Sequence, residues 1–387
     1  VLGYVSQPNQ KEIIENKIVQ ERFVPGMKIG KLGLEKKFEN HLIGTNAIQR
    51  YEVNAYGKRI NQLEFQKGSQ GNKIRLTLDT EVQKLSAKLL LNKAGSISVM
   101  DIYTGDIIAM YSSPSYDPNL FLFGISQDEW ELIRNNPLKP LIHKTISGLY
   151  SPGSTIKPIV ALSALENKII NPNFKVKCTG KTELYGQTFH CWKEKGHGFV
   201  SLKNAMKQSC DTYFYEIARL LGVDRLNITA KKFGLGEKVL GQYFDNEKQG
   251  LFPNTSWKKN NLGRGWVLGE TLITGIGQGY TQTTPLQLCL MTAQIANGGY
   301  KIKPKILVNN KPLSLEQAKN SMKFDSLHSP NLKLFDDPKN IKIVQEAIFS
   351  STNEIYGTSY KSRIDDPKYQ FAGKPGTSQV KRISKRE

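Results

Sequence analysis

An α+β fold, with helices packed on a mostly antiparallel sheet, is predicted by the order of periodic segments along the 387-residue chain. Short segments typical of β-strands come first, between residues 51 and 110. A long middle stretch repeats its apolar residues at helical spacing, and one more strand-like segment follows near residue 370. Strands, then helices, then a further strand indicate helices that cover a largely antiparallel sheet.

The first 70 residues differ from the rest of the chain. They are polar and punctuated by glycine, and two short possible strands lie at 51–53 and 60–63. The run 67–72 contains two glycines and no apolar residue, as expected of a boundary between domains. We therefore expect an N-terminal domain over residues 1–70 and a second domain over residues 71–387.

The second domain begins with clear local signals. A strand-like segment precedes Asp79, which occupies the N-cap position of a helix with Val82, Leu85 and Leu89 on its apolar face. A Tyr-Thr-Gly-Asp turn at 103–106 joins two apolar segments and predicts a β-hairpin. The expected strands are 74–78, 96–100, 107–110 and 369–372, and the expected helices include 156–165 and 202–221.

Composition excludes few classes of function. The hydrophobic fraction is 39%, and no run of 18 apolar residues occurs, so the sequence contains neither a membrane-spanning helix nor a signal peptide. The formal net charge is +20, yet no nucleic-acid-binding motif is present and the lysines and arginines are dispersed. A solvated basic surface is the first interpretation, and contact with an anionic membrane face is the second. We expect no nucleic-acid partner.

Ser154 is the candidate nucleophile. Pro152 and Gly153 lead into it, and an apolar helix follows, so its hydroxyl lies at the positive end of a helix dipole. Lys157 lies one turn further on the same face, where burial among apolar neighbours favours the neutral amine that a general base requires. Taken alone, Ser-x-x-Lys also fits an exposed Ser and Lys on any helix of a lysine-rich chain.

A second hydroxyl comes from Ser209, which precedes another apolar helix together with Asp211. Ser209 could relay a proton between Lys157 and a leaving amine, and Asp211 could hold Lys157 in place. The alternative is an ordinary helix cap, because Ser and Asp favour that position.

The third motif is the segment 374–377, Lys-Pro-Gly-Thr. Lys374 offers a cation, and Gly376 lets a substrate approach the strand edge. The Thr377 hydroxyl could bind a carboxylate, and its N–H could form an oxyanion hole with that of Ser154. A simple Pro-Gly turn is the alternative.

The three motifs occur in the order Ser-x-x-Lys, Ser-x-Asp, Lys-x-Gly, and so the chain resembles the class B penicillin-binding proteins. The resemblance covers nearly the whole chain. Within this family, the chain is most similar to the elongation type, penicillin-binding protein 2. Further segments that carry it are 33–35, 38–39, 115–119, 150–153, 275–280 and 284–287.

The resemblance implies a peptidoglycan D,D-transpeptidase that acts in cell-wall elongation. Ser154 would be acylated by the penultimate D-Ala of a stem peptide, and an amine of a neighbouring stem peptide would close the cross-link. β-Lactams would block the serine. The implied fold is the serine transpeptidase fold, a sheet between helices on both faces, on an elongated, β-rich N-terminal pedestal.

The family also implies partners and a location. Residues 1–70 would belong to a domain that docks other wall-synthesis proteins, namely a RodA-type glycosyltransferase and the scaffold MreC. The chain would be the periplasmic domain of an inner-membrane protein, anchored by an N-terminal helix that this sequence does not include.

Two features depart from the family pattern. Pro375 replaces the usual Thr or Ser, so Thr377 alone would recognise the carboxylate. The chain also ends at Glu387, before the last strands and helix of the fold, so we expect a C-terminally incomplete transpeptidase domain.

Three cysteines and a histidine lie after the first motif, and the last of them, Cys210, stands within the second. Cys178, Cys191, His197 and Cys210 form the donor set of a closed tetrahedral zinc site, although no Cys-x-x-Cys occurs. Metal-capable residues at corresponding points of elongation-type relatives favour zinc. A Cys178–Cys191 disulfide and unlinked thiols are the alternatives. Cys289 lies apart, in an apolar helix.

Other functions share parts of this pattern. A serine β-lactamase or a D,D-carboxypeptidase uses the same motifs but hydrolyses its acyl-enzyme. A non-catalytic scaffold of wall synthesis is the rival from another class, and the complete set of catalytic residues argues against it.

Overall fold

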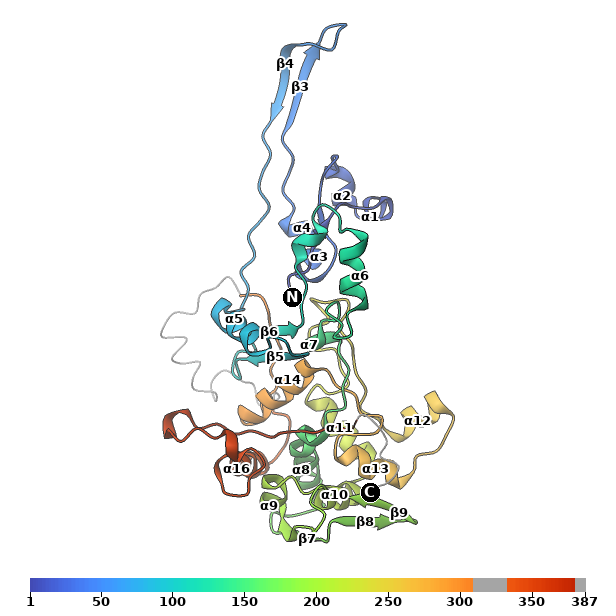
Figure 1. Cartoon of the computed structure of the whole chain (residues 1–387), viewed down its shortest axis with the longest axis vertical. Coiled ribbons are helices and arrows are strands. Elements are labelled where there is room, and N and C mark those ends of the chain that lie inside the picture. Colours follow the sequence, from blue (N-terminus) through green and yellow to red (C-terminus); the bar gives the residue numbers. More distant parts are fainter. Residues whose placement is uncertain (309–332, 380–387) are drawn as a thin grey trace.

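The computed structural model describes residues 1–308 and 333–379. The molecule is elongated, with a helical body at one end and the β3–β4 hairpin projecting at the other (Figure 1). The strands are β1 (Val5–Ser6), β2 (Ile29–Gly30), β3 (Ile48–Val53), β4 (Arg59–Gln66), β5 (Gly95–Met100), β6 (Ile107–Ser113), β7 (Lys175–Cys178), β8 (Lys181–Leu184), β9 (Gln187–His190) and β10 (Gly198–Ser201).

The helices of the first half are α1 (Gln10–Glu15), α2 (Lys17–Arg22), α3 (Gly33–Lys37), α4 (Glu39–Leu42), α5 (Thr80–Leu89), α6 (Gln127–Asn135), α7 (Lys144–Ser147) and α8 (Lys157–Glu166). Those of the second half are α9 (Leu202–Lys207), α10 (Asp211–Leu221), α11 (Val223–Lys232), α12 (Thr255–Leu262), α13 (Leu268–Gly275), α14 (Pro285–Ala296) and α16 (Pro338–Asn353). The 3₁₀ turns are η1 (Pro118–Phe121), η2 (Gly153–Ile156), η5 (Tyr360–Ser362) and η6 (Pro367–Tyr369).

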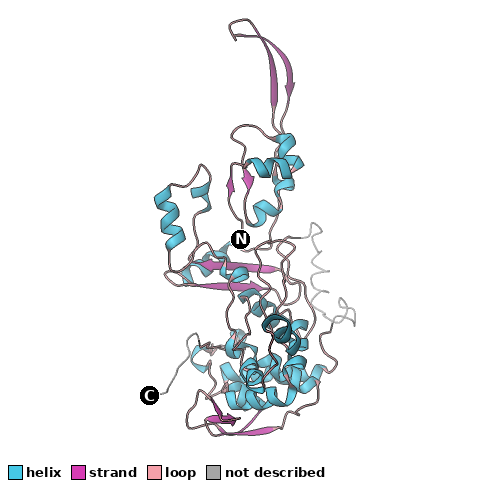
Figure 2. Ribbon diagram, turned by 90° about the vertical axis from the view of Figure 1, so that its right-hand side faces the viewer, coloured by secondary structure: helices cyan, strands magenta, loops and turns pink. Residues whose placement is uncertain are grey.

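The predicted α+β class is confirmed. In the described residues every sheet is a two-stranded antiparallel pair: β1–β2, β3–β4, β5–β6, β7–β10 and β8–β9. Helices α5, α7 and α14 pack on the β5–β6 pair, which crosses the molecule between the N-terminal part and the helical body (Figure 2).

The predicted hairpin forms, and the two possible strands near 51–53 and 60–63 also pair with each other. β5 pairs with β6 from Gly95 opposite Ser113 to Met100 opposite Ile107, across the turn at 103–106. β3 pairs with β4 in the N-terminal part. Asp79 caps α5 as expected, because its carboxylate accepts the backbone N–H groups of Glu81 and Val82.

Two predicted strands are absent. The segment 74–78 contains only an isolated bridge from Leu76 to Leu307, so it lacks a ladder of hydrogen bonds. In the segment 369–372, Tyr369 ends η6 and residues 370–372 are irregular chain. Among the described residues no strand lies alongside it, and a strand needs such a partner for its backbone groups.

Two helix predictions needed correction. The run 202–221 is divided into α9 and α10 by residues 208–210, where Ser209 has a left-handed backbone with φ +54°. Helix α5 exists, but the predicted apolar face is not its buried one. Leu85 and Leu89 are exposed, whereas Ser86 is buried.

The main core surrounds α8, whose residues from Lys157 to Leu165 are all buried, and α9, α10, α11 and α16 pack around it. A second buried cluster joins the N-terminal residues to the rest of the molecule, because it contains Leu34 together with Ile107, Met110 and Ile146. Within the described residues no helix combines the length and hydropathy that crossing a membrane requires.

Candidate active site

Ser154 lies in the 3₁₀ turn η2, immediately before α8. The turn is held by backbone-to-backbone contact, because the N–H of Gly153 donates to the carbonyl oxygen of Gly277 at 2.9 Å. A Cβ on Gly277 would lie 2.2 Å from the carbonyl oxygen of Gly153, so only glycine fits there. The turn that carries Ser154 is therefore closely packed against the backbone at Gly277.

Lys157 is completely buried beneath that turn. Its Nζ donates to Asp211 Oδ1 at 2.8 Å, to the Ser209 carbonyl oxygen at 2.9 Å and to Ser209 Oγ at 3.2 Å. Asp211 thus holds Lys157, as the sequence indicates. Among the described residues the Ser154 hydroxyl has no hydrogen-bond partner, and a contact between nucleophile and base often tightens only when substrate binds.

Ser209 lies between two lysines. Its Oγ accepts from Lys157 and also from Lys374 Nζ, at 2.8 Å. Because both contacts use oxygen lone pairs, the Ser209 proton is free to point towards a substrate. The left-handed backbone at Ser209 is uncommon for a residue other than glycine, and such conformations cluster at functional sites.

Lys374 has an unusual pKa. Burial, assisted by the neighbouring charge of Lys157 and opposed by Asp211, lowers the pKa of Lys374 to about 7. The side chain therefore changes its charge near neutral pH, which is typical of active-site groups.

The segment 374–377 packs against the nucleophile turn. A Cβ on Gly376 would lie 2.7 Å from Thr155 Cγ2 and 2.8 Å from the Pro152 carbonyl oxygen. The space that Gly376 leaves is therefore filled by protein, so its small size brings the third motif close to Ser154. The Thr377 carbonyl oxygen lies 2.5 Å from the position of a Cβ on Gly153, and the Thr377 side chain is exposed.

Trp192 belongs to the site, although no sequence signal pointed to it. Its backbone N–H donates to Asp211 Oδ2 at 3.0 Å, and its indole Nε1 donates to the Gln208 carbonyl oxygen at 3.0 Å. Asp211 therefore joins Lys157 on one side to the loop after Cys191 on the other. A backbone donor leaves no trace in residue type, which is why the sequence could not reveal this link.

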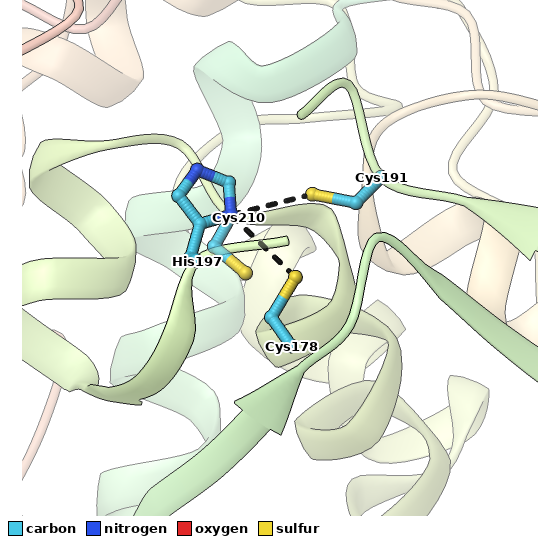
Figure 3. A group of neighbouring side chains, drawn as sticks. All are labelled: Cys178, Cys191, His197 and Cys210. Carbon is cyan, nitrogen blue, oxygen red and sulfur yellow. Dashed lines mark hydrogen bonds between the residues drawn. The ribbon is translucent and has the colours of Figure 1, made fainter. Parts of the chain in front are cut away.

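The four predicted metal ligands converge. Cys178, Cys191, His197 and Cys210 place their ligand atoms within 4.8 Å of one another, as Figure 3 shows. His197 Nδ1 lies 3.5 Å from Cys178 Sγ and 3.6 Å from Cys191 Sγ. A tetrahedral zinc site with Zn–S near 2.3 Å and Zn–N near 2.0 Å separates its ligand atoms by about 3.5–3.8 Å, so the cluster fits this ion.

The state of the thiols also suits a metal. All four cysteines of the chain are free in the structure, so the alternative Cys178–Cys191 disulfide is not formed. Hydrogen bonding from Cys210, with support from His197, holds the pKa of Cys191 far below its usual value. Cys191 therefore favours the thiolate, the form that binds metal, whereas the same contact raises the pKa of Cys210. Cys289 lies elsewhere, on α14, and burial raises its pKa to about 12.

Two family models match the chain. The penicillin binding protein transpeptidase domain covers residues 95–387, and the penicillin-binding protein dimerisation domain covers residues 1–76. The boundary at residue 70 remains a prediction, since residues 77–94 lie between the two matches.

Curated relatives align over the full chain. Peptidoglycan D,D-transpeptidase MrdA of Acinetobacter baumannii is 35% identical over 390 residues, which is 99% of this chain and 56% of that protein. MrdA of Escherichia coli (strain K12) is 33% identical over 384 residues, with 98% and 59% covered. The chain thus spans a little over half the length of these relatives.

Solved structures agree in fold. The complex between penicillin-binding protein PBP2 and MreC from Helicobacter pylori matches with a TM-score of 0.83 at 33% identity, covering 98% of this chain and 68% of that one. Pseudomonas aeruginosa PBP2 in complex with WCK 5153 matches with a TM-score of 0.79 at 34% identity, covering 93% and 73%. With its three motifs assembled around Ser154 and a transpeptidase match over most of its length, the chain belongs to the penicillin-binding protein transpeptidase family.

Proposed function

We propose that the chain carries the catalytic centre of a peptidoglycan D,D-transpeptidase. The observation that supports this most is the position of Ser209, whose hydroxyl contacts both Lys157 and Lys374 beside the turn that bears Ser154. Acyl transfer to a serine requires a nucleophile and groups that move its proton, and Ser154, the two amines and the bridging hydroxyl supply them.

Acylation uses these groups in order. Ser154 Oγ attacks the carbonyl carbon of the penultimate D-Ala and gives its proton to Lys157 Nζ, which acts as a neutral amine in this step. The backbone N–H groups of Ser154 and Thr377 stabilise the oxyanion. The peptide C–N bond breaks, Ser209 passes a proton to the leaving nitrogen, and the terminal D-Ala departs as a free amino acid.

Cross-linking reverses the proton flow. An amine of a second stem peptide attacks the acyl-enzyme carbonyl, its proton returns through Ser209 and Lys157 to Ser154 Oγ, and a new amide forms. β-Lactams enter the first step and stay attached, because ring opening leaves the departing nitrogen tethered in the site.

A product assay tests this function. The protein is incubated with a D-Ala-D-Ala pentapeptide and a D-amino-acid acceptor, and products are read by mass spectrometry. We expect D-Ala release and an amide between donor and acceptor, both absent in Ser154→Ala. Hydrolysed tetrapeptide alone would identify a D,D-carboxypeptidase, rapid penicillin turnover a β-lactamase, and no reaction a scaffold.

Zinc at the Cys178, Cys191, His197 and Cys210 cluster is part of the proposal. The ion would link β7, the loop after β9 and the turn before α10, and so would fix the position of Ser209 and Asp211. Its contribution is structural, because four protein ligands leave no open position. Elemental analysis should find one zinc per chain, and Cys210→Ser should lose it and melt at lower temperature. A wild type that contains no zinc and melts at the same temperature as Cys210→Ser would contradict this.

Partner docking through the N-terminal part completes the proposal. The β3–β4 hairpin exposes Ile60, Leu63 and Phe65, and a solved relative was determined with MreC. We assign MreC and a RodA-type glycosyltransferase as partners and the periplasm as the location. Purified MreC should bind the wild type and not Leu63→Glu, whereas the matched surface variant Leu132→Glu, on α6, should bind normally. Equal binding by both variants would remove the hairpin from this role.

A further inference from the structure

A recessed basic surface lies beside the C-terminal end of α11, lined by none of the catalytic residues. Its cavity of about 770 Å³ is bounded by α11, the turn between β5 and β6, and the segment 301–305. The lining, here called the lysine pocket, contains six lysines: Lys231, Lys232, Lys238, Lys301, Lys303 and Lys305.

One wall of the pocket is an ordered row of cations. Residues 301–306 alternate, with the lysines turned outward and Ile302, Pro304 and Ile306 buried. This period of two places successive lysines about 6.6 Å apart along extended chain. The row is anchored, because Lys305 N donates to the Gly105 carbonyl oxygen at 2.8 Å and Lys305 O accepts from Ile107 N at 2.9 Å.

The turn between β5 and β6 packs directly against the backbone of this row. A Cβ on Gly105 would lie 2.4 Å from the Lys303 carbonyl oxygen. The backbone of the row is therefore held in a fixed place beside the turn. Across the cavity stand Lys231 and Lys232, from the last turn of α11.

Most of these charges are unpaired. Among the pocket lysines, as far as the described residues show, Lys305 alone forms an ion pair, with Asp106 at 3.5 Å, and Lys238 interacts electrostatically with Glu247. Glu237 is the only acidic residue of the lining. Cations gathered around one recess repel each other, and an anionic ligand relieves that repulsion. Lysines supply point charges on flexible stems, which suits several separated anionic groups more than one planar group.

We propose that the lysine pocket binds the carboxylates of a second stem peptide on the strand that the active site is cross-linking. The proposal rests on the proposed function, because a glycan strand displays acidic stem peptides at regular intervals. The recessed shape favours discrete anionic groups over the flat surface of a membrane. Binding there would hold the strand while Ser154 reacts with its neighbour.

Strand binding by a pocket variant tests the proposal. Lys232→Gln/Lys303→Gln removes two unpaired cations, and Lys88→Gln/Lys342→Gln removes two exposed lysines outside the pocket, so the net charge is matched. The probe is soluble, uncross-linked glycan strands with intact pentapeptides, at low salt. We expect the pocket variant to bind about tenfold more weakly and the control to bind as the wild type does.

Three further measurements separate the outcomes. Strands with amidated carboxylates should bind the wild type as weakly as intact strands bind the pocket variant. Acylation of Ser154 by a fluorescent penicillin should be equal in all forms, because the substituted lysines are not catalytic residues. Equal strand binding by the two double variants would overturn the proposal. Tight binding of amidated strands to the wild type would overturn it as well. So would a pocket variant that loses binding to anionic lipid vesicles but keeps its binding to strands. Absence of penicillin labelling in the wild type would instead overturn the proposed function.

Discussion

Lys157 connects the whole catalytic arrangement at the scale of single residues. Its fully buried Nζ lies 2.8 Å from Asp211 Oδ1 and contacts two oxygens of Ser209. The sequence predicted that Asp211 holds Lys157. It did not predict the free-energy cost of burying this pair, because spacing does not show how deeply a side chain is buried. A buried ion pair becomes a liability when one partner is removed.

Lys157→Met should therefore affect both stability and chemistry. We expect acylation by penicillin to fall at least about a thousandfold, because the base is lost. The free energy of unfolding should fall by about 3–5 kcal/mol, because Asp211 remains unpaired. The double variant Lys157→Met/Asp211→Asn should regain much of that stability without regaining acylation. Unfolding curves and labelling rates check both parts, and recovered acylation would show that Lys157 is not the base.

Lys374 predicts a pH dependence. Burial first, then the Lys157 charge, lowers its pKa to about 7, so Lys374 is a cation below that pH and neutral above it. A cation attracts the carboxylate of a β-lactam. The second-order rate constant of acylation should therefore fall as pH rises through about 7. Lys374→Arg, which stays charged, should lack this fall. Identical profiles for both proteins would assign the dependence to another group.

At the scale of elements, the supports of the nucleophile come from distant parts of the chain. The turn η2 rests on the loop after α13, and the third motif rests on η2. Periodicity predicted α8 and the β5–β6 hairpin, because those elements satisfy their backbone groups locally. It did not predict the left-handed break at Ser209 or the irregular 369–372 segment, because both depend on neighbours that are remote in sequence.

Gly277 tests this support. Its φ is +74° and a Cβ there would meet Gly153 O at 2.2 Å, so Gly277→Ala combines backbone strain with a clash. We expect a loss of about 2–5 kcal/mol and slower acylation. Gly263→Ala has a similar φ of +64° but nothing within 4 Å, and should cost only about 1–2 kcal/mol with normal acylation. Equal effects of the two variants would mean that the contact with η2 is unimportant.

At the scale of the whole molecule, the N-terminal part and the body share a core. The domain boundary near residue 70 stays a prediction, and Leu34 on one side of it lies in the same buried cluster as Ile107, Met110 and Ile146 on the other. Composition shifts mark where a chain becomes irregular, and they carry no information on contacts made across the boundary.

Leu34→Ala should consequently destabilise the entire protein. Leu34 is 4% exposed, so we expect a loss of about 2–5 kcal/mol in a single unfolding transition. Leu63→Ala, at 67% exposed on the hairpin, should change stability by less than about 0.5 kcal/mol. Two separate transitions, with only one shifted by Leu34→Ala, would show that the two parts unfold independently.

The central claim is that Ser154 is the acylated nucleophile of this site. Intact mass after incubation with penicillin measures it directly, and peptide mapping locates the adduct. We predict one adduct per chain, on Ser154, and none in Ser154→Ala, which should fold and melt as the wild type does. An adduct that persists in Ser154→Ala, or a wild type that takes up no penicillin, would contradict the account.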